Sequence, residues 1–123
     1  MSDPGAGRDM ALTRLRDHLR AFAAARDWDQ FHTPKNLAIA LSVEAAELLE
    51  HFQWLSDKGS LTPPADRLGK IEEEIADVFL YLIRLSDVLN VDLIQAADRK
   101  IAVNARKYPI EKARGTAKKY TEL

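Results

Sequence analysis

Apolar residues recur every three or four positions along most of this chain, which is the spacing of one face of an α-helix. The first such segment runs from Asp9 to about Arg26, and the second from Pro34 to about Leu55. The third extends to about Leu89, and the fourth runs from Asp92 until the Tyr108–Pro109 step, where proline disfavours helix. The pattern therefore predicts four helices.

Residues that start and stop helices agree with these ranges. Thr33–Pro34 and Thr62–Pro63 each pair a capping hydroxyl with a proline at the first helical position. Asp92 is a further capping residue, and Asn90, two residues before it, is predicted to stop the third helix. Residues 56–64 contain a glycine and two prolines, so they are predicted to form a surface loop that reverses the chain.

The fold class predicted from this pattern is all-α, because no run of alternating or β-branched residues and no hairpin turn indicates a strand. The third helix carries apolar residues nearly all the way round, and such a helix must be covered on two faces. A four-helix chain this short can hardly do that alone, so we expect the bundle to form a homo-oligomer. Residues 1–8 are predicted to be a disordered tail, 9–109 the helical domain, and 110–123 a basic, partly ordered tail.

The composition narrows the function classes. A chain of 123 residues with 18 basic and 19 acidic side chains has a net charge of -1, which disfavours binding to a nucleic-acid backbone. The absence of cysteine excludes disulfides, thiolate zinc sites and a cysteine nucleophile. No apolar run approaches the roughly 20 residues that cross a bilayer, so no membrane partner is expected. The first residues do not resemble a secretory signal, so a cytoplasmic location is the expectation.

Carboxylates interrupt the apolar faces of two consecutive helices. Glu44 lies between Leu41 and Leu48 in the stripe of the second helix, and Glu47 follows one turn later at its flank. A carboxylate in apolar surroundings is destabilising unless it is protonated, paired or bound to a cation. The third helix repeats the arrangement with Glu74 and Asp77, so antiparallel packing of the two helices would bring four carboxylates together.

Two interpretations of these acids differ in what balances their charge. They could form ion pairs at the edges of the stripes, with Lys70, Lys100 or Arg84 as partners. Two matched pairs on consecutive helices instead favour a metal site, since the second helix offers no Lys or Arg between Asn36 and Leu55. Ligands that are all oxygen suit Mg²⁺, with Mn²⁺ as a substitute, and disfavour structural zinc. A di-iron site of the ferritin type would need a Glu-x-x-His spacing that is absent here.

These motifs carry a resemblance to a known family. Glu44-x-x-Glu47 followed by Glu74-x-x-Asp77 resembles the signature of the MazG-like all-α nucleoside triphosphate pyrophosphohydrolases. Further segments look like the dCTP pyrophosphatase branch of that family, and the resemblance covers about residues 12–123. These segments are Arg26 to His32, Asn36–Leu37, Glu44 to Trp54, Asp77 to Tyr81, Tyr108–Pro109 and Lys119 to Leu123.

The resemblance implies a four-helix MazG-like bundle in which Glu44, Glu47, Glu74 and Asp77 hold Mg²⁺. It also implies hydrolysis of a deoxynucleoside triphosphate to the monophosphate and pyrophosphate. A triphosphate brings about four negative charges, which can approach four carboxylates only when divalent cations screen them. Either Glu44 or Glu47 would act as general base, and the sequence does not choose between them.

The resemblance further implies substrate contacts. Lys100 and Asn104 lie four residues apart on one face of the fourth helix, and Tyr108 adds a hydroxyl one turn later. By resemblance these three match phosphate-contacting positions, although a solvated basic face would have the same spacing. Three aromatic residues match positions that enclose the base, although lone aromatics more often belong to a core. They are Trp28, Trp54 and Tyr81.

We therefore expect an Mg²⁺-dependent enzyme that acts on dCTP or a related pyrimidine deoxynucleotide, with base-modified ones among the candidates. By resemblance its homo-oligomer is a tetramer. Two alternatives remain open. One is a dUTP or broad-range nucleoside triphosphate pyrophosphohydrolase of the same superfamily, and the other is a non-catalytic helical interaction module whose acids form ion pairs with a partner.

Overall fold

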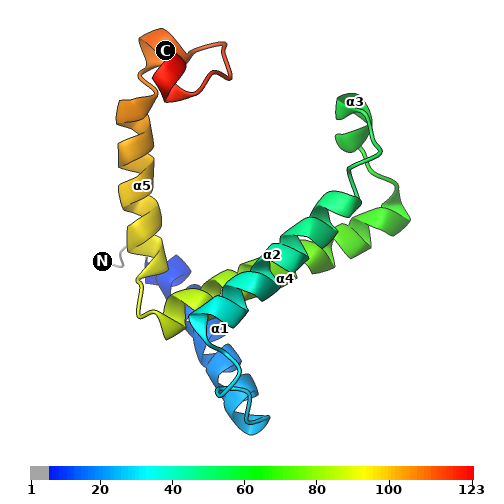
Figure 1. Ribbon diagram of the computed structural model, residues 1–123, viewed down its shortest axis with the longest axis vertical. Coiled ribbons are helices and arrows are strands. Elements are labelled where there is room, and N and C mark those ends of the chain that lie inside the picture. Colours follow the sequence, from blue (N-terminus) through cyan, green and yellow to red (C-terminus); the bar gives the residue numbers. More distant parts are fainter. Residues whose placement is uncertain (1–5) are drawn as a thin grey trace. The chain divides into compact units, whose positions relative to one another are not determined.

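The fold was analysed in a computed structural model that describes residues 6–123. This part of the chain is helical with no strand, which confirms the all-α prediction (Figure 1). It forms two compact units, one that ends at Val91 and one that comprises Asp92–Leu123. The helices are α1 (Ala6–Ala25), α2 (Pro34–Glu50), α3 (Asp57–Ser60), α4 (Ala65–Val88), α5 (Leu93–Lys107), α6 (Ile110–Ala113) and the 3₁₀ turn η1 (Tyr120–Glu122).

Local capping explains three of the helix ends. The Thr33 hydroxyl accepts a hydrogen bond from the Asn36 backbone N–H at 3.2 Å, so α2 begins where the sequence predicts. Asp92 caps α5 in the same way and accepts from the Gln95 N–H at 3.0 Å. Asn90 follows α4 with a φ of 57°, a left-handed conformation that stops the helix and that asparagine tolerates well.

Two other boundary predictions are wrong. Helix α2 ends at Glu50 rather than at Leu55, because the chain then changes to three-residue turn bonds such as Phe52 N–H to Leu49 carbonyl. The predicted loop 56–64 contains the short helix α3, which the Ser56 hydroxyl caps by accepting from the Gly59 N–H at 3.0 Å.

The start of α4 also differs from the prediction. Thr62 does not cap it, since the helix begins at Ala65 with Pro64 at the capping position. The reason is local, because a proline disfavours helical conformation at the residue before it. Pro64 therefore keeps Pro63 out of the helix, and α4 can begin only after the second proline.

The N-terminal helix is longer than predicted. Helix α1 begins at Ala6, three residues before the predicted start at Asp9. Residues 1–5 of the predicted disordered tail lie outside the described residues. No helix within residues 6–123 combines the length and the apolarity that crossing a bilayer requires.

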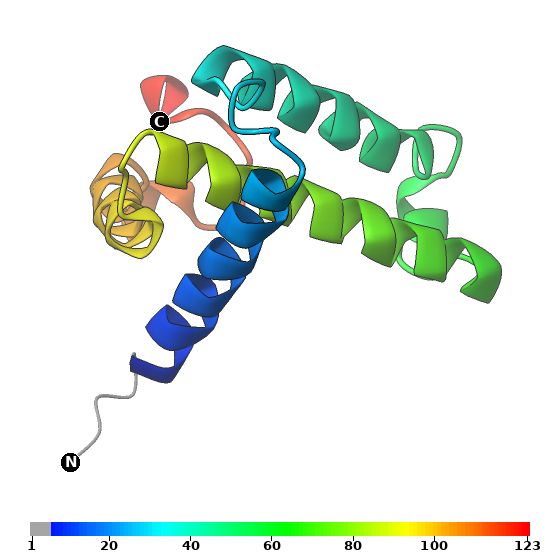
Figure 2. The same cartoon turned by 90° about the horizontal axis from the view of Figure 1, so that it is seen from below.

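Helices α1, α2 and α4 make up the first unit. Two perpendicular views show α2 and α4 running side by side in opposite directions, and α1 packs across α4 (Figures 1 and 2). The buried apolar residues of this unit come from all three helices, and they are Ala23, Leu37, Ile71 and Ile83. The antiparallel arrangement of α2 and α4 is the condition under which the four predicted acids converge.

Helix α4 also has an apolar face that the described residues of its own unit leave uncovered. Four large residues lie within roughly 60° of one another around this helix, at about 100° per residue. Their exposed fractions are 45% for Leu68, 52% for Ile75, 42% for Phe79 and 38% for Leu82. We call these four residues the α4 stripe. A second apolar face on this helix is as the sequence predicts, whereas the homo-oligomer expected to cover it stays a prediction.

The second unit consists of α5, α6 and η1. The Tyr120 ring packs edge-on against the Tyr108 ring, with centroids 6.2 Å apart. The Lys107 ammonium lies 4.8 Å from the centre of the Tyr120 ring, which is a cation–π contact. These contacts hold the C-terminal segment against the end of α5. The predicted domain boundaries at residues 9, 109 and 110 stay a prediction.

Candidate functional site

Three carboxylates from two neighbouring helices meet in one place. Glu44 belongs to α2, and Glu74 and Asp77 belong to α4. One carboxylate oxygen from each lies within 4.8 Å of the others, a separation that a single cation can span. The antiparallel packing of α2 against α4 brings these positions together, and we call the three residues the acidic cluster.

The acidic cluster contains oxygens that have no partner of their own. Glu44 Oε2 and Glu74 Oε2 are both buried, and neither has a hydrogen-bond partner in the part of the chain that the structure describes. Neither Lys70 nor Arg84 forms an ion pair with the cluster, and Arg84 instead pairs with other acids. Because a buried, unpaired carboxylate is costly, the donor set fits a divalent cation.

A neighbouring carboxyl group and burial change the protonation of Glu44. A hydrogen bond to Glu74, followed by burial and then by Glu47, raises the pKa of Glu44 to about 7. This hydrogen bond forms only when one of the two carboxyl groups is protonated, so the ionised oxygens have no donor within residues 6–123. The folded chain therefore favours either a proton or a cation at this point.

Glu47 lies beside the acidic cluster rather than within it. Its oxygens are not among those that approach within 4.8 Å, but its charge and a side-chain hydrogen bond both act on Glu44. Tyr81 borders the same place, since burial and then the charges of Glu44 and Asp77 raise the pKa of its hydroxyl. The structure thus brings together Glu44, Glu74 and Asp77 and places Glu47 and Tyr81 next to them.

The two predicted tryptophans differ in their surroundings. Trp28 follows α1 and is 42% exposed, with its ring edge-on to Phe22 at 5.6 Å between centroids. Trp54 lies in the turn between α2 and α3 and is 88% exposed. Trp54 therefore contributes almost nothing to packing within the first unit, which leaves its ring face available to other molecules.

The predicted phosphate contacts all belong to the second unit. Lys100 and Asn104 are exposed on α5, and their spacing of four residues places them on the same face of that helix. Tyr108 is half-buried at the C-terminal end of α5, where its ring contacts Tyr120. The unit therefore presents a lysine and an asparagine along one face, with a tyrosine at the end of the helix.

A family model described as the MazG-like family matches residues 39–123, which include α2 from Ile39 onward and all of α4 and α5. The chain belongs to the MazG-like family. The match contains every residue of the acidic cluster, and it confirms the family resemblance of the Glu44-x-x-Glu47 and Glu74-x-x-Asp77 motifs.

Named relatives of this MazG-like chain include dCTP pyrophosphatase 1 of Mus musculus, 47% identical over 105 residues, and that of Homo sapiens, 46% identical over 106 residues. Each alignment covers 83% of this chain and 61% of the relative, so the chain spans about three fifths of their length. The chain is also similar to the crystal structure of a pyrophosphatase from Archaeoglobus fulgidus, with 48% identity and a TM-score of 0.76. That match covers 80% of this chain and 93% of the other.

The sequence did not predict the polar contacts that Arg84 makes. Arg84 lies on α4 and forms an ion pair with Asp29, from the turn after α1, and a hydrogen bond to His32. From the sequence, Arg84 was expected only as an ion-pair partner for the four carboxylates of the predicted metal site. The signal that could have found it is a single arginine between Ile83 and Leu85, in a stretch of α4 that is otherwise apolar.

Proposed function

We propose that this MazG-like protein is an Mg²⁺-dependent pyrophosphohydrolase that converts dCTP, or a related pyrimidine deoxynucleotide including base-modified ones, to the monophosphate and pyrophosphate. The observation that carries the proposal is the pair of buried glutamate oxygens without partners at the meeting point of α2 and α4. The relatives named dCTP pyrophosphatase and pyrophosphatase support the choice of reaction.

The ligands proposed for Mg²⁺ are Glu44, Glu47, Glu74 and Asp77. A donor set made only of carboxylate oxygens fits Mg²⁺ and accepts Mn²⁺ as a substitute. When bound, Mg²⁺ neutralises phosphate charge and lowers the pKa of water. The chain contributes the fixed spacing of the carboxylates, which two packed helices hold in place before the substrate arrives.

The general base is proposed to come from the pair Glu44 and Glu47. Both are half-buried on α2, one turn apart, so that each can reach a water molecule near the acidic cluster. A carboxylate held within reach of that water can accept its proton.

Substrate recognition is proposed to involve six residues outside the metal ligands. Lys100, Asn104 and Tyr108 would donate hydrogen bonds to phosphate oxygens, since lysine binds phosphate as a positive charge. An apolar pocket with flat walls suits a base, and Trp28, Trp54 and Tyr81 are proposed to supply them. The high exposure of Trp54 supports this assignment, because packing within its own unit does not explain it.

The working protein is proposed to be a homotetramer. The α4 stripe supports this, because monomeric soluble proteins rarely leave such a contiguous apolar face uncovered. Light scattering at micromolar concentration should therefore give a mass near four chains, and Phe79→Glu should lower that mass. A monomer at that concentration would contradict the argument from the α4 stripe.

Magnesium titration tests the enzyme against the interaction module. The expected result is metal-dependent thermal stabilisation together with pyrophosphate release from deoxynucleoside triphosphates, both lost in Glu44→Gln. Indifference to Mg²⁺ and to Glu44→Gln would favour the module. Rates of pyrophosphate release from a panel of canonical and base-modified nucleotides then show which base the enzyme prefers. A preference for dUTP would favour a dUTP pyrophosphohydrolase instead. Equal rates across the panel would favour a broad-range nucleoside triphosphate pyrophosphohydrolase.

Trp54→Ala tests the base pocket separately. Aromatic stacking on a base contributes about 1–3 kcal/mol, so KM for dCTP should rise by at least about fivefold. Leu61→Ala is the matched control, because Leu61 is also 80% exposed and has no assigned role. An unchanged KM in Trp54→Ala would mean that Trp54 does not contact the base.

A further inference from the structure

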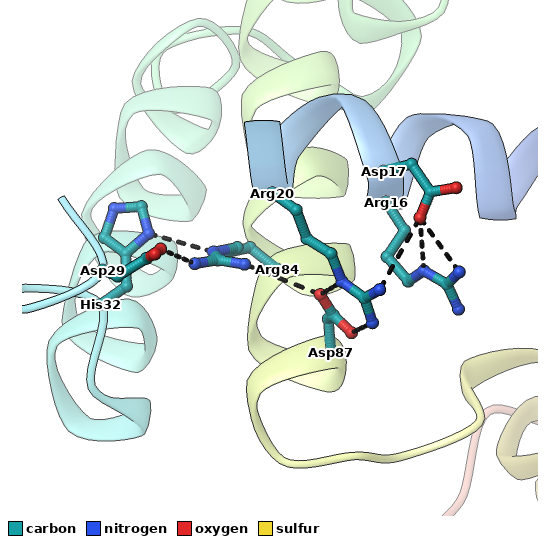
Figure 3. Close-up of polar contacts among 7 residues, drawn as sticks. All are labelled: Arg16, Asp17, Arg20, Asp29, His32, Arg84 and Asp87. Carbon is teal, nitrogen blue, oxygen red and sulfur yellow. Dashed lines mark hydrogen bonds and ion pairs between the residues drawn. The ribbon is translucent and has the colours of Figure 1, made fainter. Parts of the chain in front are cut away.

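A second polar network lies outside the acidic cluster and joins three segments of the first unit (Figure 3). Arg20 on α1 donates through both Nε and Nη2 to the Asp87 carboxylate on α4. On the other side of Asp87, Arg84 Nη1 lies 3.6 Å from Asp87 Oδ2. Arg84 also donates through Nη2 to Asp29 Oδ1 at 2.7 Å and through Nε to His32 Nδ1 at 3.1 Å.

The centre of this network is withdrawn from water. The side chains of Arg84 and Asp87 are only 11% and 10% exposed. Charged hydrogen bonds at such depth are stronger and more directional than those at the surface. The pair Arg16–Asp17 on α1 is a useful contrast, because its side chains are 38% and 55% exposed and such pairs contribute little.

The network holds the turn that carries Trp28. Asp29 and His32 lie on the C-terminal side of Trp28 in the same turn, and Arg84 binds both of them. The Trp28 backbone N–H donates to the Ala23 carbonyl at 2.9 Å, and the Trp28 ring lies 6.2 Å from the His32 ring between centroids. Trp28 is thus placed from one side by α1 and from the other by Arg84.

Arg84 also determines which nitrogen of His32 carries the proton. The Nε of arginine always bears a hydrogen, so His32 Nδ1 must accept, and the proton of the neutral ring must be on Nε2. Burial, followed by the positive charge of Arg84, lowers the pKa of His32. The ring beside Trp28 is therefore neutral at physiological pH, with Nε2–H as its only donor.

We propose that Arg84 is a positioning residue for nucleotide recognition, which holds Trp28 and the Nε2–H tautomer of His32 in the one arrangement that binds the base. This inference rests on the proposed function, in which Trp28 contacts the base. Arg84 itself does not need to touch the substrate, since it acts through the turn. Without Arg84 the turn samples other arrangements, and the apparent affinity is multiplied by the fraction of molecules that remain competent to bind.

Arg84→Met is the decisive variant, because it should fold. Methionine replaces the apolar stem of the arginine, and the buried Asp87 keeps both hydrogen bonds from Arg20. Asp29 is 61% exposed and can be hydrated when it loses its partner. Arg84→Lys is the second variant, since a single ammonium retains the charge but cannot reproduce the planar, three-way contact. Arg16→Met is the control for loss of an arginine at the surface.

The first measurement is Mg²⁺-dependent hydrolysis of dCTP. If the competent fraction falls to about a tenth, KM rises about tenfold in Arg84→Met while kcat stays within about twofold. Arg84→Lys should lie between the parent and Arg84→Met, and Arg16→Met should match the parent. A merely structural role would lower kcat through loss of folded protein and leave KM unchanged.

The second measurement needs no nucleotide and therefore separates this inference from the proposed function. In a Trp54→Phe background, Trp28 is the only tryptophan. Arg84→Met in that background should shift the Trp28 emission to longer wavelength and increase its quenching by acrylamide, whereas Arg16→Met should not. Unchanged Trp28 quenching together with an unchanged KM overturns the positioning role while leaving the proposed function intact. A parent protein that neither binds nor hydrolyses dCTP overturns both.

Discussion

Glu44→Gln should stabilise the metal-free protein and at the same time remove its response to Mg²⁺. The amide has nearly the shape of the carboxylate, but it carries no charge and brings hydrogen-bond donors of its own. It therefore removes a charge that is unfavourable in the folded chain, since the hydrogen bond to Glu74, burial and Glu47 together raise the pKa of Glu44 to about 7. The same substitution deletes one proposed ligand.

The magnitude follows from the pKa. The ordinary value is 4.5 and the folded value about 7, and each pKa unit corresponds to about 1.4 kcal/mol. Because Glu44 is half-buried, solvent screens part of the free energy that corresponds to this pKa difference. We therefore expect about 1–2 kcal/mol of destabilisation by the ionised carboxylate. A folded pKa above the unfolded one means that the contribution of Glu44 to metal-free stability is most favourable below pH 4.5, falls as pH rises to about 7, and changes no further above it.

Thermal unfolding at pH 5 and pH 8, with EDTA or with Mg²⁺, measures this directly. Without metal at pH 8, Glu44→Gln should melt about 5–10 °C above the parent, and the difference should shrink at pH 5. With Mg²⁺ at about 100 times its Kd, the parent gains about 2.7 kcal/mol and should overtake the variant.

Glu50→Gln is the matched control, since Glu50 is an exposed glutamate on the same helix and the change in charge is identical. It should alter neither the metal-free melting temperature nor the Mg²⁺ response. The reasoning is refuted if Glu44→Gln lowers the metal-free melting temperature at pH 8, because the carboxylate would then be favourably paired. A full Mg²⁺ response in the variant would equally show that Glu44 is not a ligand.

Three further predictions concern the scaffold. Asn90→Ala should lower the unfolding free energy by about 1 kcal/mol while Asn90→Gly does not, because the left-handed φ of 57° penalises a Cβ; urea unfolding of both variants checks this. Asp92→Ala should cost about 1 kcal/mol through loss of the α5 cap, and an unchanged urea midpoint would contradict it. The hydrogen bond from Arg20 lowers the pKa of Asp87 below 3.8, so the stability it contributes is present above that pH and lost as pH falls further. Urea midpoints between pH 5 and pH 2 should therefore drop less in Asp87→Asn than in the parent.

Local chemistry in the sequence determined most of the helical framework. Thr33 and Asp92 cap the helices that the sequence assigned to them, and Asn90 stops α4. The error at Thr62–Pro63 was also local, since the second proline excludes the first from the helix. Helix ends are predictable to this extent because their hydrogen bonds join residues three or four positions apart.

The carboxylates were recognisable from sequence for a different reason. Glu44 stands in an apolar stripe, and a charge in such a place demands compensation wherever the helix packs. The sequence could not determine which oxygens meet, because that depends on how α2 lies against α4. The packing decided that Glu44, Glu74 and Asp77 share one point and that Glu47 borders it.

The network around Arg84 was decided by tertiary structure alone. Its partners Asp29 and His32 lie 55 and 52 residues away along the chain, so no periodicity or spacing connects them. The pKa of Glu44 likewise depends most on Glu74, a residue of another helix. Helical periodicity and capping are properties of neighbouring residues, whereas burial and charge pairing belong to segments that meet only when the chain has folded.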